Sequence, residues 1–344
     1  MTYHKLNIYD FLRPAKIDLQ LYNTKPFTMK TIFNHLGIKF LLISIFLISC
    51  KTEKKSDELQ KKIPLVNENI ITVVTQNMDF QMVDTIPSGW NTFVYKNESN
   101  ETHFFLLDKY PEGKNIENTL TDVAPVFAEG MDLINNGKSQ EGFAAFNKLP
   151  AWFFDIVFSG GVGLIAPKHT ATTTVKLDPG YYIMECYVKM PNGMFHTLMG
   201  MAKPVIVTDK DSGNTPPEAT VNITLSGETG ISYDNPIAKG KQVFSVFVKD
   251  QKPHENFMQH DVNLVKLDED ASVEALEKWM DWSDPKGLIT PVPNGITFLG
   301  GVNDMPAGST GYFTVDLKPG NYAFVSEVPN TLSKNLLKTF RIVD

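Results

Sequence analysis

The sequence predicts an all-β fold of two tandem Greek-key β-sandwiches, each with a helical insertion. Short stretches in which apolar and polar residues alternate recur along the chain and indicate strands. The chain also repeats itself, most clearly in the turns LDPGYY at 177–182 and LKPGNY at 317–322. A glycine pair precedes each turn at the same distance, at 160–161 and 300–301. The repeat therefore spans a whole domain, which excludes a solenoid of short units.

Residues 1–50 are predicted to be an upstream segment followed by a secretion signal. Met29 makes the better start, because basic residues follow it and a short apolar run at 40–48 comes next. That run is too short to span a bilayer as a permanent helix. It ends in LISC, which resembles the lipobox of bacterial lipoproteins, and this resemblance implies that Cys50 carries a lipid.

Residues 51–68 are predicted to form a charged tether, because their mixed charges and few apolar side chains cannot bury enough surface to fold. Lys51 follows the lipobox cysteine, at the position where an aspartate favours inner-membrane retention in Gram-negative lipoproteins. The resemblance therefore implies a cell-envelope protein, lipid-anchored in the outer membrane, on its periplasmic face or at the cell surface.

The segment DKDSGNTPPEAT is rich in turn formers and divides the repeat. We therefore expect one domain at 69–209 and a second at 218–344. Helical patterns before each glycine pair predict an insertion at 115–149 in the first domain and another at 271–282 in the second. Ser272 is suited to cap the second of these helical insertions.

Four residues of the first domain are candidate metal ligands. Once Cys50 is lipidated, Cys186 is the one cysteine left, so a disulfide within the monomer is excluded. A free thiol in an exported protein is open to oxidation unless it is buried or bound. His196 and Met201 follow this cysteine in the spacing Cys-x9-His-x4-Met, and His103 stands earlier, at the start of an apolar strand.

These elements, in this order, resemble the cupredoxins, the fold of the small blue copper proteins. In that family one histidine lies on an earlier strand after an Asn-rich turn, and Cys, His and Met follow on the loop between the last two strands. The resemblance implies copper held by His103, Cys186 and His196, with Met201 as axial ligand, and a role in electron transfer. The loop between Cys and His is longer than in typical members, and Pro191-Asn192-Gly193 is predicted to fold the excess into a turn.

The second domain keeps a histidine, His260, and the LKPGNY turn, but Ser326 takes the place of the cysteine. The loop that follows, VPNTLSKNLLK, has no histidine and no methionine. The second domain is therefore predicted to lack a copper site of this type and to serve structure or docking.

Two alternatives to electron transfer stay open at this point. In the first, the protein handles Cu(I), which the methionines of this loop would bind softly together with Cys186 and His196. Met199 would then replace Met201 as the thioether ligand. In the second, the chain binds no metal and is a cupredoxin-like binding or scaffold module, in which Cys186 is a small buried apolar residue.

Composition and motifs exclude other classes. The net charge of −7 and the pI near 5.6 argue against nucleic acid as the main partner. The chain has no G-x-S-x-G, no H-E-x-x-H and no Gly-rich phosphate loop, so it is predicted not to be an enzyme. The expected partners are a membrane, through the lipid anchor, and a redox or copper-transfer protein.

Overall fold

The computed structural model describes residues 70–344 except 253–258. The predicted signal, the lipidation site Cys50 and the charged tether lie outside these described residues. Among the helices of the described part, none is both long and apolar enough to cross a membrane.

Seven strands make up the first half of the fold. They are β1 (Ile70–Thr75), β2 (Thr85–Asn97), β3 (His103–Lys109), β4 (Val157–Ile165), β5 (Thr170–Leu177), β6 (Gly180–Glu185) and β7 (Ala202–Asp211). Alternating residues explain most of them: along β2, for example, Phe93 and Tyr95 are fully buried while Val94 between them is partly exposed. β3 differs, because it is buried on both faces along almost its whole length.

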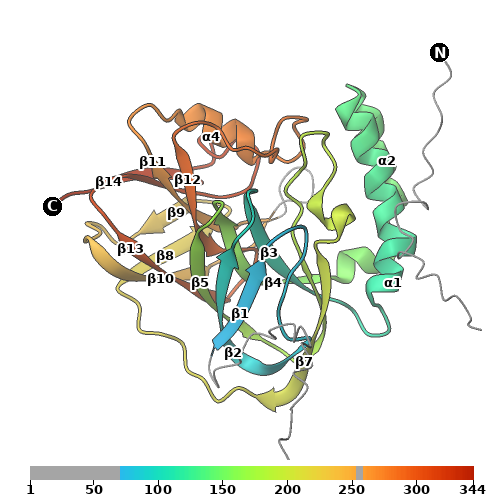
Figure 1. The fold of residues 1–344 in the computed structure, drawn as a ribbon, viewed down its shortest axis with the longest axis horizontal. Coiled ribbons are helices and arrows are strands. Elements are labelled where there is room, and N and C mark those ends of the chain that lie inside the picture. Colours follow the sequence, from blue (N-terminus) through green and yellow to red (C-terminus); the bar gives the residue numbers. More distant parts are fainter. Residues whose placement is uncertain (1–69, 253–258) are drawn as a thin grey trace, which may run out of the picture. The chain divides into compact units, whose positions relative to one another are not determined.

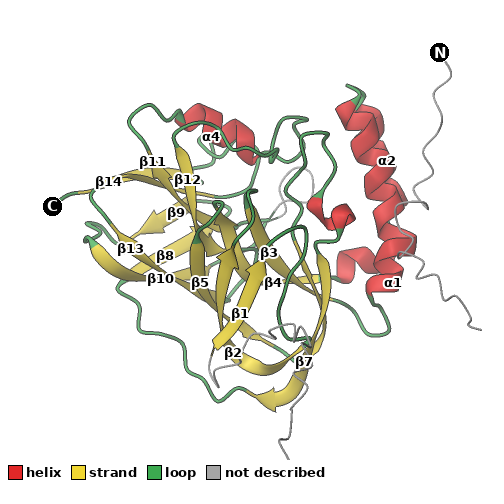
Figure 2. Cartoon of the chain, viewed as in Figure 1, coloured by secondary structure: helices red, strands yellow, loops and turns green. Residues whose placement is uncertain are grey.

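Eight strands make up the second half. They are β8 (Val221–Ser226), β9 (Gly230–Tyr233), β10 (Gly240–Val248), β11 (Val262–Leu267), β12 (Ile296–Val302), β13 (Thr310–Leu317), β14 (Gly320–Val325) and β15 (Leu337–Ile342). The strands are drawn in yellow in Figure 2 and dominate the chain. The predicted all-β fold class, with a few helices, is confirmed.

The pairing of the strands repeats between the halves. β1 runs parallel to β2 as β8 runs parallel to β10, and the antiparallel pairs β2–β5, β3–β4, β3–β6 and β6–β7 recur as β10–β13, β11–β12, β11–β14 and β14–β15. The glycine that ends each repeated turn pairs in the same way, Gly180 with Val207 and Gly320 with Ile342. Only β9, among the described strands, has no counterpart in the other half.

The two halves are joined through their sheets. In one layer β4 pairs with β12, and in the other β5 pairs with β13. The long strand β2 links the layers, because its first residues pair with β7 and its later residues pair with β5. One hydrophobic core runs through both halves. Figure 1 shows the strands of both halves lying together. The predicted division into domains at 69–209 and 218–344 stays a prediction.

Helices occur where the helical patterns predicted them. The first insertion contains α1 (Ile116–Asn118), a π-helical turn (Thr119–Val123), α2 (Ala124–Asn135), α3 (Ser139–Ala145) and two 3-10 turns (Phe146–Lys148 and Ala151–Asp155). The second contains α4 (Val273–Met280). The Ser272 side chain accepts a hydrogen bond from the Ala275 backbone N–H, so the predicted cap is confirmed.

The repeated glycine pairs mark irregular pairing in β4 and β12. Gly161 has φ +153° and Gly301 has φ +151°. A Cβ atom on Gly161 would lie 2.0 Å from the Phe105 carbonyl oxygen, and one on Gly301 would lie 2.0 Å from that of Val262. Both positions exclude any side chain, which is why the pair stands out in the sequence of each half.

Candidate metal centre

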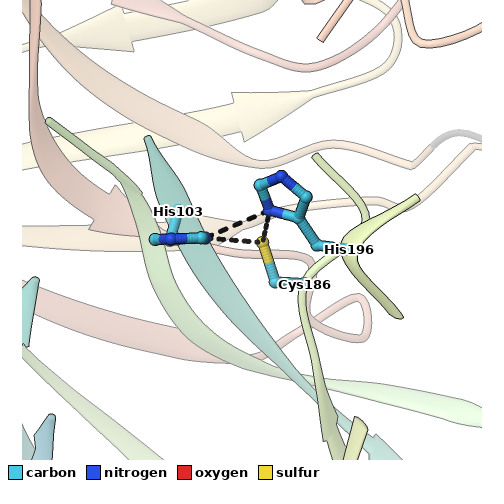
Figure 3. A group of neighbouring side chains, drawn as sticks. All are labelled: His103, Cys186 and His196. Carbon is cyan, nitrogen blue, oxygen red and sulfur yellow. Dashed lines mark hydrogen bonds between the residues drawn. The ribbon is translucent and has the colours of Figure 1, made fainter. Parts of the chain in front are cut away.

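The side chains of His103, Cys186 and His196 converge in the interior. The Cys186 Sγ lies 3.7 Å from the Nδ1 of His103 and 3.8 Å from the Nδ1 of His196, and the two nitrogens are 3.1 Å apart. Figure 3 shows both imidazole rings and the thiol directed toward one another. The circle through three points at these separations has a radius of about 2.1 Å, within the usual range of metal bonds to nitrogen and sulfur.

A buried asparagine holds the turn that places His103 at the start of β3. The Asn97 side-chain amide donates to the backbone carbonyls of Glu101, Ile165 and Ala166. Its carbonyl oxygen accepts from the backbone N–H and the hydroxyl of Ser99. Because every polar atom of this amide is engaged, the Asn-rich turn before the histidine is a fixed structure.

The long loop between the other two residues is folded back on itself. The Met190 backbone N–H donates to the Met194 carbonyl, and Gly193 closes the predicted turn with a φ of +81°. The His196 N–H donates to the Val188 carbonyl. This hairpin places His196 beside Val188, which follows Cys186 by two residues in the chain. The extra length of the loop therefore does not separate the side chains of Cys186 and His196.

Burial sets the protonation of all three side chains. It lowers the pKa of His103 to about 3, with a contribution from His196, and lowers the pKa of His196 to about 4. Both imidazoles are therefore neutral at pH 7 and can offer a nitrogen lone pair. Burial also raises the pKa of the Cys186 thiol to about 12, although hydrogen bonds from the Phe104 and Val188 backbones oppose the rise. Without a metal the sulfur carries a proton.

The structure places the fourth predicted ligand next to this group. Met201 is fully buried, its backbone N–H donates to the His196 carbonyl, and its carbonyl accepts from the Cys186 N–H. The methionine is thus fixed beside two members of the group through its backbone. Its assignment as axial ligand stays a prediction.

In the second half the serine that replaces the cysteine is hydrogen-bonded to an acid. The Ser326 hydroxyl donates to the Asp261 carboxylate, and the Glu327 backbone N–H points to the same oxygen. Among the described residues, His103, Cys186 and His196 are the one group whose side chains meet the spacing of a metal site.

Sequence reasoning missed Lys189, which ties the ligand loop to the second half. Its ammonium group is buried and donates to the backbone carbonyls of Trp282 (2.9 Å) and Asp284 (2.8 Å). Its backbone N–H donates to the Leu288 carbonyl, and its own carbonyl accepts from Thr290. Burial lowers the pKa of this lysine to about 8, while Asp284 opposes the change. A lysine in a loop gives no sequence signal for such a contact.

A set of buried carboxyl groups was also missed. Asp108 on β3 and Glu185 on β6 are hydrogen-bonded to each other, and Asp304, Asp261 and Glu327 of the second half are buried too. Burial raises the pKa of Asp108, Asp304 and Glu327 well above the ordinary range. The signal was present in the sequence, because Asp108 and Glu185 interrupt the apolar strands HFFLLDK and YYIMECYV.

These carboxyl groups are expected to make the metal-free chain less stable as the pH rises from 6.5 to 8. The folded chain keeps protons that the unfolded chain has released, so the free energy of unfolding falls by up to about 1.4 kcal/mol per pH unit for each such proton. Two opposing effects bound this window: below pH 6.5 the unfolded chain also takes up protons on His103 and His196, and near pH 8 the folded chain begins to lose the Lys189 proton. Across the window the several buried carboxyl groups outweigh the single lysine. Urea denaturation at pH 6.5 and 8 measures the slope, and Asp108→Asn should flatten it. A slope of zero in the parent chain would contradict the prediction.

Several solved structures are similar to this chain. Auracyanin A, a "blue" copper protein from Chloroflexus aurantiacus, is 20% identical, and the alignment covers 40% of this chain and 98% of auracyanin, with a TM-score of 0.25. Reduced auracyanin from Roseiflexus castenholzii is 22% identical over 41% of this chain and 97% of that protein, with a TM-score of 0.25. No protein-family model and no curated protein matches the sequence.

The comparison corrects one prediction. The copper-containing nitrite reductase from Thermus scotoductus is 11% identical over 80% of this chain and 61% of that enzyme, with a TM-score of 0.21. Multicopper oxidases, which are enzymes as well, also match. The prediction that the chain is not an enzyme, which excluded all enzymes, is therefore wrong. The motifs whose absence supported it belong to hydrolases and nucleotide-binding proteins, whereas a redox metal centre draws its ligands from separate strands.

Proposed function

We propose that this chain is a cell-envelope lipoprotein that binds copper in its first half and transfers single electrons. The observation that supports this best is the triangle of His103 Nδ1, His196 Nδ1 and Cys186 Sγ. Two imidazoles and a thiolate in a plane suit both oxidation states of copper, and a bound copper ion would supply one-electron chemistry. The residues could hold the ion with little movement, because their donor atoms already lie about one bond length from a common centre.

The surroundings of this group also suit electron transfer. His103, Cys186 and His196 each have a relative exposure of 0%, so water is kept from the thiol. The Thr197 hydroxyl donates to the Cys186 carbonyl, and the Cys186 N–H donates to Met201. These contacts hold the ligand backbone in one geometry, and little rearrangement between oxidation states favours fast electron exchange.

The alternative of a Cu(I)-handling protein has less support. Met194 and Met199 are 36% and 40% exposed, which would suit soft surface ligands. However, the Cys186 thiol and both imidazoles are buried, so a partner protein cannot reach them to accept the ion. The metal-free alternative gives no reason for the Nδ1 atoms of two imidazoles to face one thiol in the interior.

The lipid anchor rests on the sequence pattern that ends at Cys50. Cys50→Ala is expected to abolish lipid labelling and release the protein from membranes. Equal membrane association of this variant and the parent would count against the lipoprotein part of the proposal. The part that concerns copper does not depend on it.

An absorption spectrum after copper addition tests the copper site. Cu(II) should give the full chain a strong visible thiolate-to-copper charge-transfer band. Cys186→Ser should erase the band. Met201→Leu should shift it, whereas Met199→Leu, which alters a side chain on the same loop that is 40% exposed, should leave it unchanged. Tight Cu(II) binding without such a band, or no binding, would overturn the proposal.

A further inference from the structure

A cavity of about 130 Å³ lies beside the candidate metal centre. Its walls come from β3, the helical insertion, the ligand loop and the second half. Most of the wall is aromatic or aliphatic, and its aromatic side chains include those of Tyr110, Phe127, Phe153, Phe158, Tyr187 and Trp282. Its size is similar to that of cavities that hold a single benzene ring. Phe153, Ile156 and Leu198 line it and are partly exposed, so it opens toward the surface.

Three carboxyl groups line the same cavity, those of Asp108, Glu185 and Asp304. No lysine, arginine or histidine is among the described residues of its lining. The hydroxyl groups nearby are engaged, because Thr119 bonds Tyr110 and Thr197 donates to the Cys186 carbonyl. Apart from the protons on the carboxyl groups themselves, the side chains of the described lining therefore offer acceptors and no positive charge.

One of these acceptors is unsatisfied. Asp108 is 4% exposed, and its Oδ1 has no hydrogen-bond partner. A buried carboxyl oxygen without a donor is costly, so native proteins rarely keep one unless a ligand or water completes it. A ligand with N–H groups would supply the missing donors.

A bare metal ion does not fit this need. The oxygens of the three carboxyl groups do not form one of the groups close enough to hold an ion, since the described residues contain only the His-Cys-His group. Aromatic rings around carboxyl groups suit an organic cation instead, because ring faces attract positive charge and the apolar walls accept a hydrocarbon body.

We propose that the cavity binds a small organic ammonium ion whose apolar body is about the size of one aromatic ring. The ammonium group lies against Asp108, where it displaces the proton that this carboxyl group keeps in the empty cavity, and the proton goes to solvent. The apolar body packs against the aromatic wall. Glu185 and Thr197 precede and follow residues of the metal group in the chain, so the bound cation sits next to the ligands. The proposal does not depend on copper.

Calorimetric titration of the purified, metal-free full chain tests the proposal with three probes of similar shape: benzylammonium, benzyl alcohol and benzoate. Benzylammonium is expected to bind at least tenfold more tightly than benzyl alcohol, and benzoate is expected not to bind. Equal affinity for benzylammonium and benzyl alcohol, or no heat from benzylammonium at millimolar concentration, would overturn the proposal. The copper spectrum is a separate measurement, so failure of one proposal leaves the other standing.

Variants locate the site. Asp108→Asn should weaken benzylammonium at least tenfold and leave benzyl alcohol unchanged. Asp155→Asn is the matched control, because Asp155 is exposed and lies between two residues of the cavity rim, Phe153 and Ile156. Ala124→Phe should fill the cavity and abolish binding of both probes. This second variant tests whether the ligand binds in the cavity even if Asp108→Asn does not fold. Undiminished benzylammonium binding in a folded Ala124→Phe chain would place the ligand elsewhere and refute the assignment.

Discussion

Raising the pH from 6 to 8 is expected to tighten metal binding by the full chain about a hundredfold, because each metal ion displaces one proton. The proton comes from Cys186, whose thiol pKa burial raises to about 12, with smaller contributions from Glu185 and Glu327. His103 and His196 release none, because their pKa values of about 3 and 4 leave them neutral at pH 6. The logarithm of the affinity should therefore rise by about one per pH unit.

Competition with a chelator for Cu(I), measured under anaerobic conditions at pH 6, 7 and 8, gives this slope. Cys186→Ser should lose most of the affinity and the pH dependence together, because a serine hydroxyl does not become a ligand by losing a proton in this range. A slope near two would mean that a histidine also releases a proton. A slope near zero in the parent chain would mean that the sulfur is already a thiolate, which contradicts the effect of burial.

Gly161→Ala is expected to destabilise the chain by about 3 kcal/mol or more. The new Cβ would lie 2.0 Å from the Phe105 carbonyl oxygen, so β3 and β4 must separate. The φ of +153° adds backbone strain. The Gly161 carbonyl also accepts from the Asn303 N–H, so the disturbance reaches the contact between the two halves.

Urea denaturation measures this loss, and the repeat supplies the comparison. Gly301→Ala should cost a similar amount, since its Cβ would approach the Val262 carbonyl oxygen equally closely. Gly308→Ala is the control for conformation alone: it has φ +80° and no atom within 4 Å of its added Cβ, so we expect a loss of only about 1 kcal/mol. A loss at Gly161 no larger than that at Gly308 would show that the strands are not packed as described.

Much of the fold was predictable because the repeat and the alternation are local properties of the sequence. The turns at 177–182 and 317–322 and the cap at Ser272 are cases of this kind. The convergence of His103 with Cys186 could be predicted only from resemblance to a family, since strands brought together by a fold leave no mark in a single sequence.

Other features depended on tertiary contacts. The joining of β4 to β12 and of β5 to β13 was not predicted, because a strand's alternation does not reveal its neighbour. The burial of Lys189 depends on two backbone carbonyls in the other half. Because every residue has a backbone carbonyl, the sequence does not indicate which ones will accept a hydrogen bond from a lysine. The presence of Asp108 and Glu185 in apolar strands could have indicated a buried acidic site. The walls of the cavity could not be predicted, because they come from four segments that are distant in the sequence.

The continuous layers have a consequence for how the molecule comes apart. If the halves were separated at the turn-rich segment, β4 and β5 on one side and β12 and β13 on the other would each lose a partner. Four unpaired sheet edges would then face solvent, and such edges recruit strands from other molecules. Each half alone would thus tend to self-associate, whereas in the intact chain each half caps the edges of the other. Unfolding of one half uncovers the other, so both should melt in a single cooperative transition.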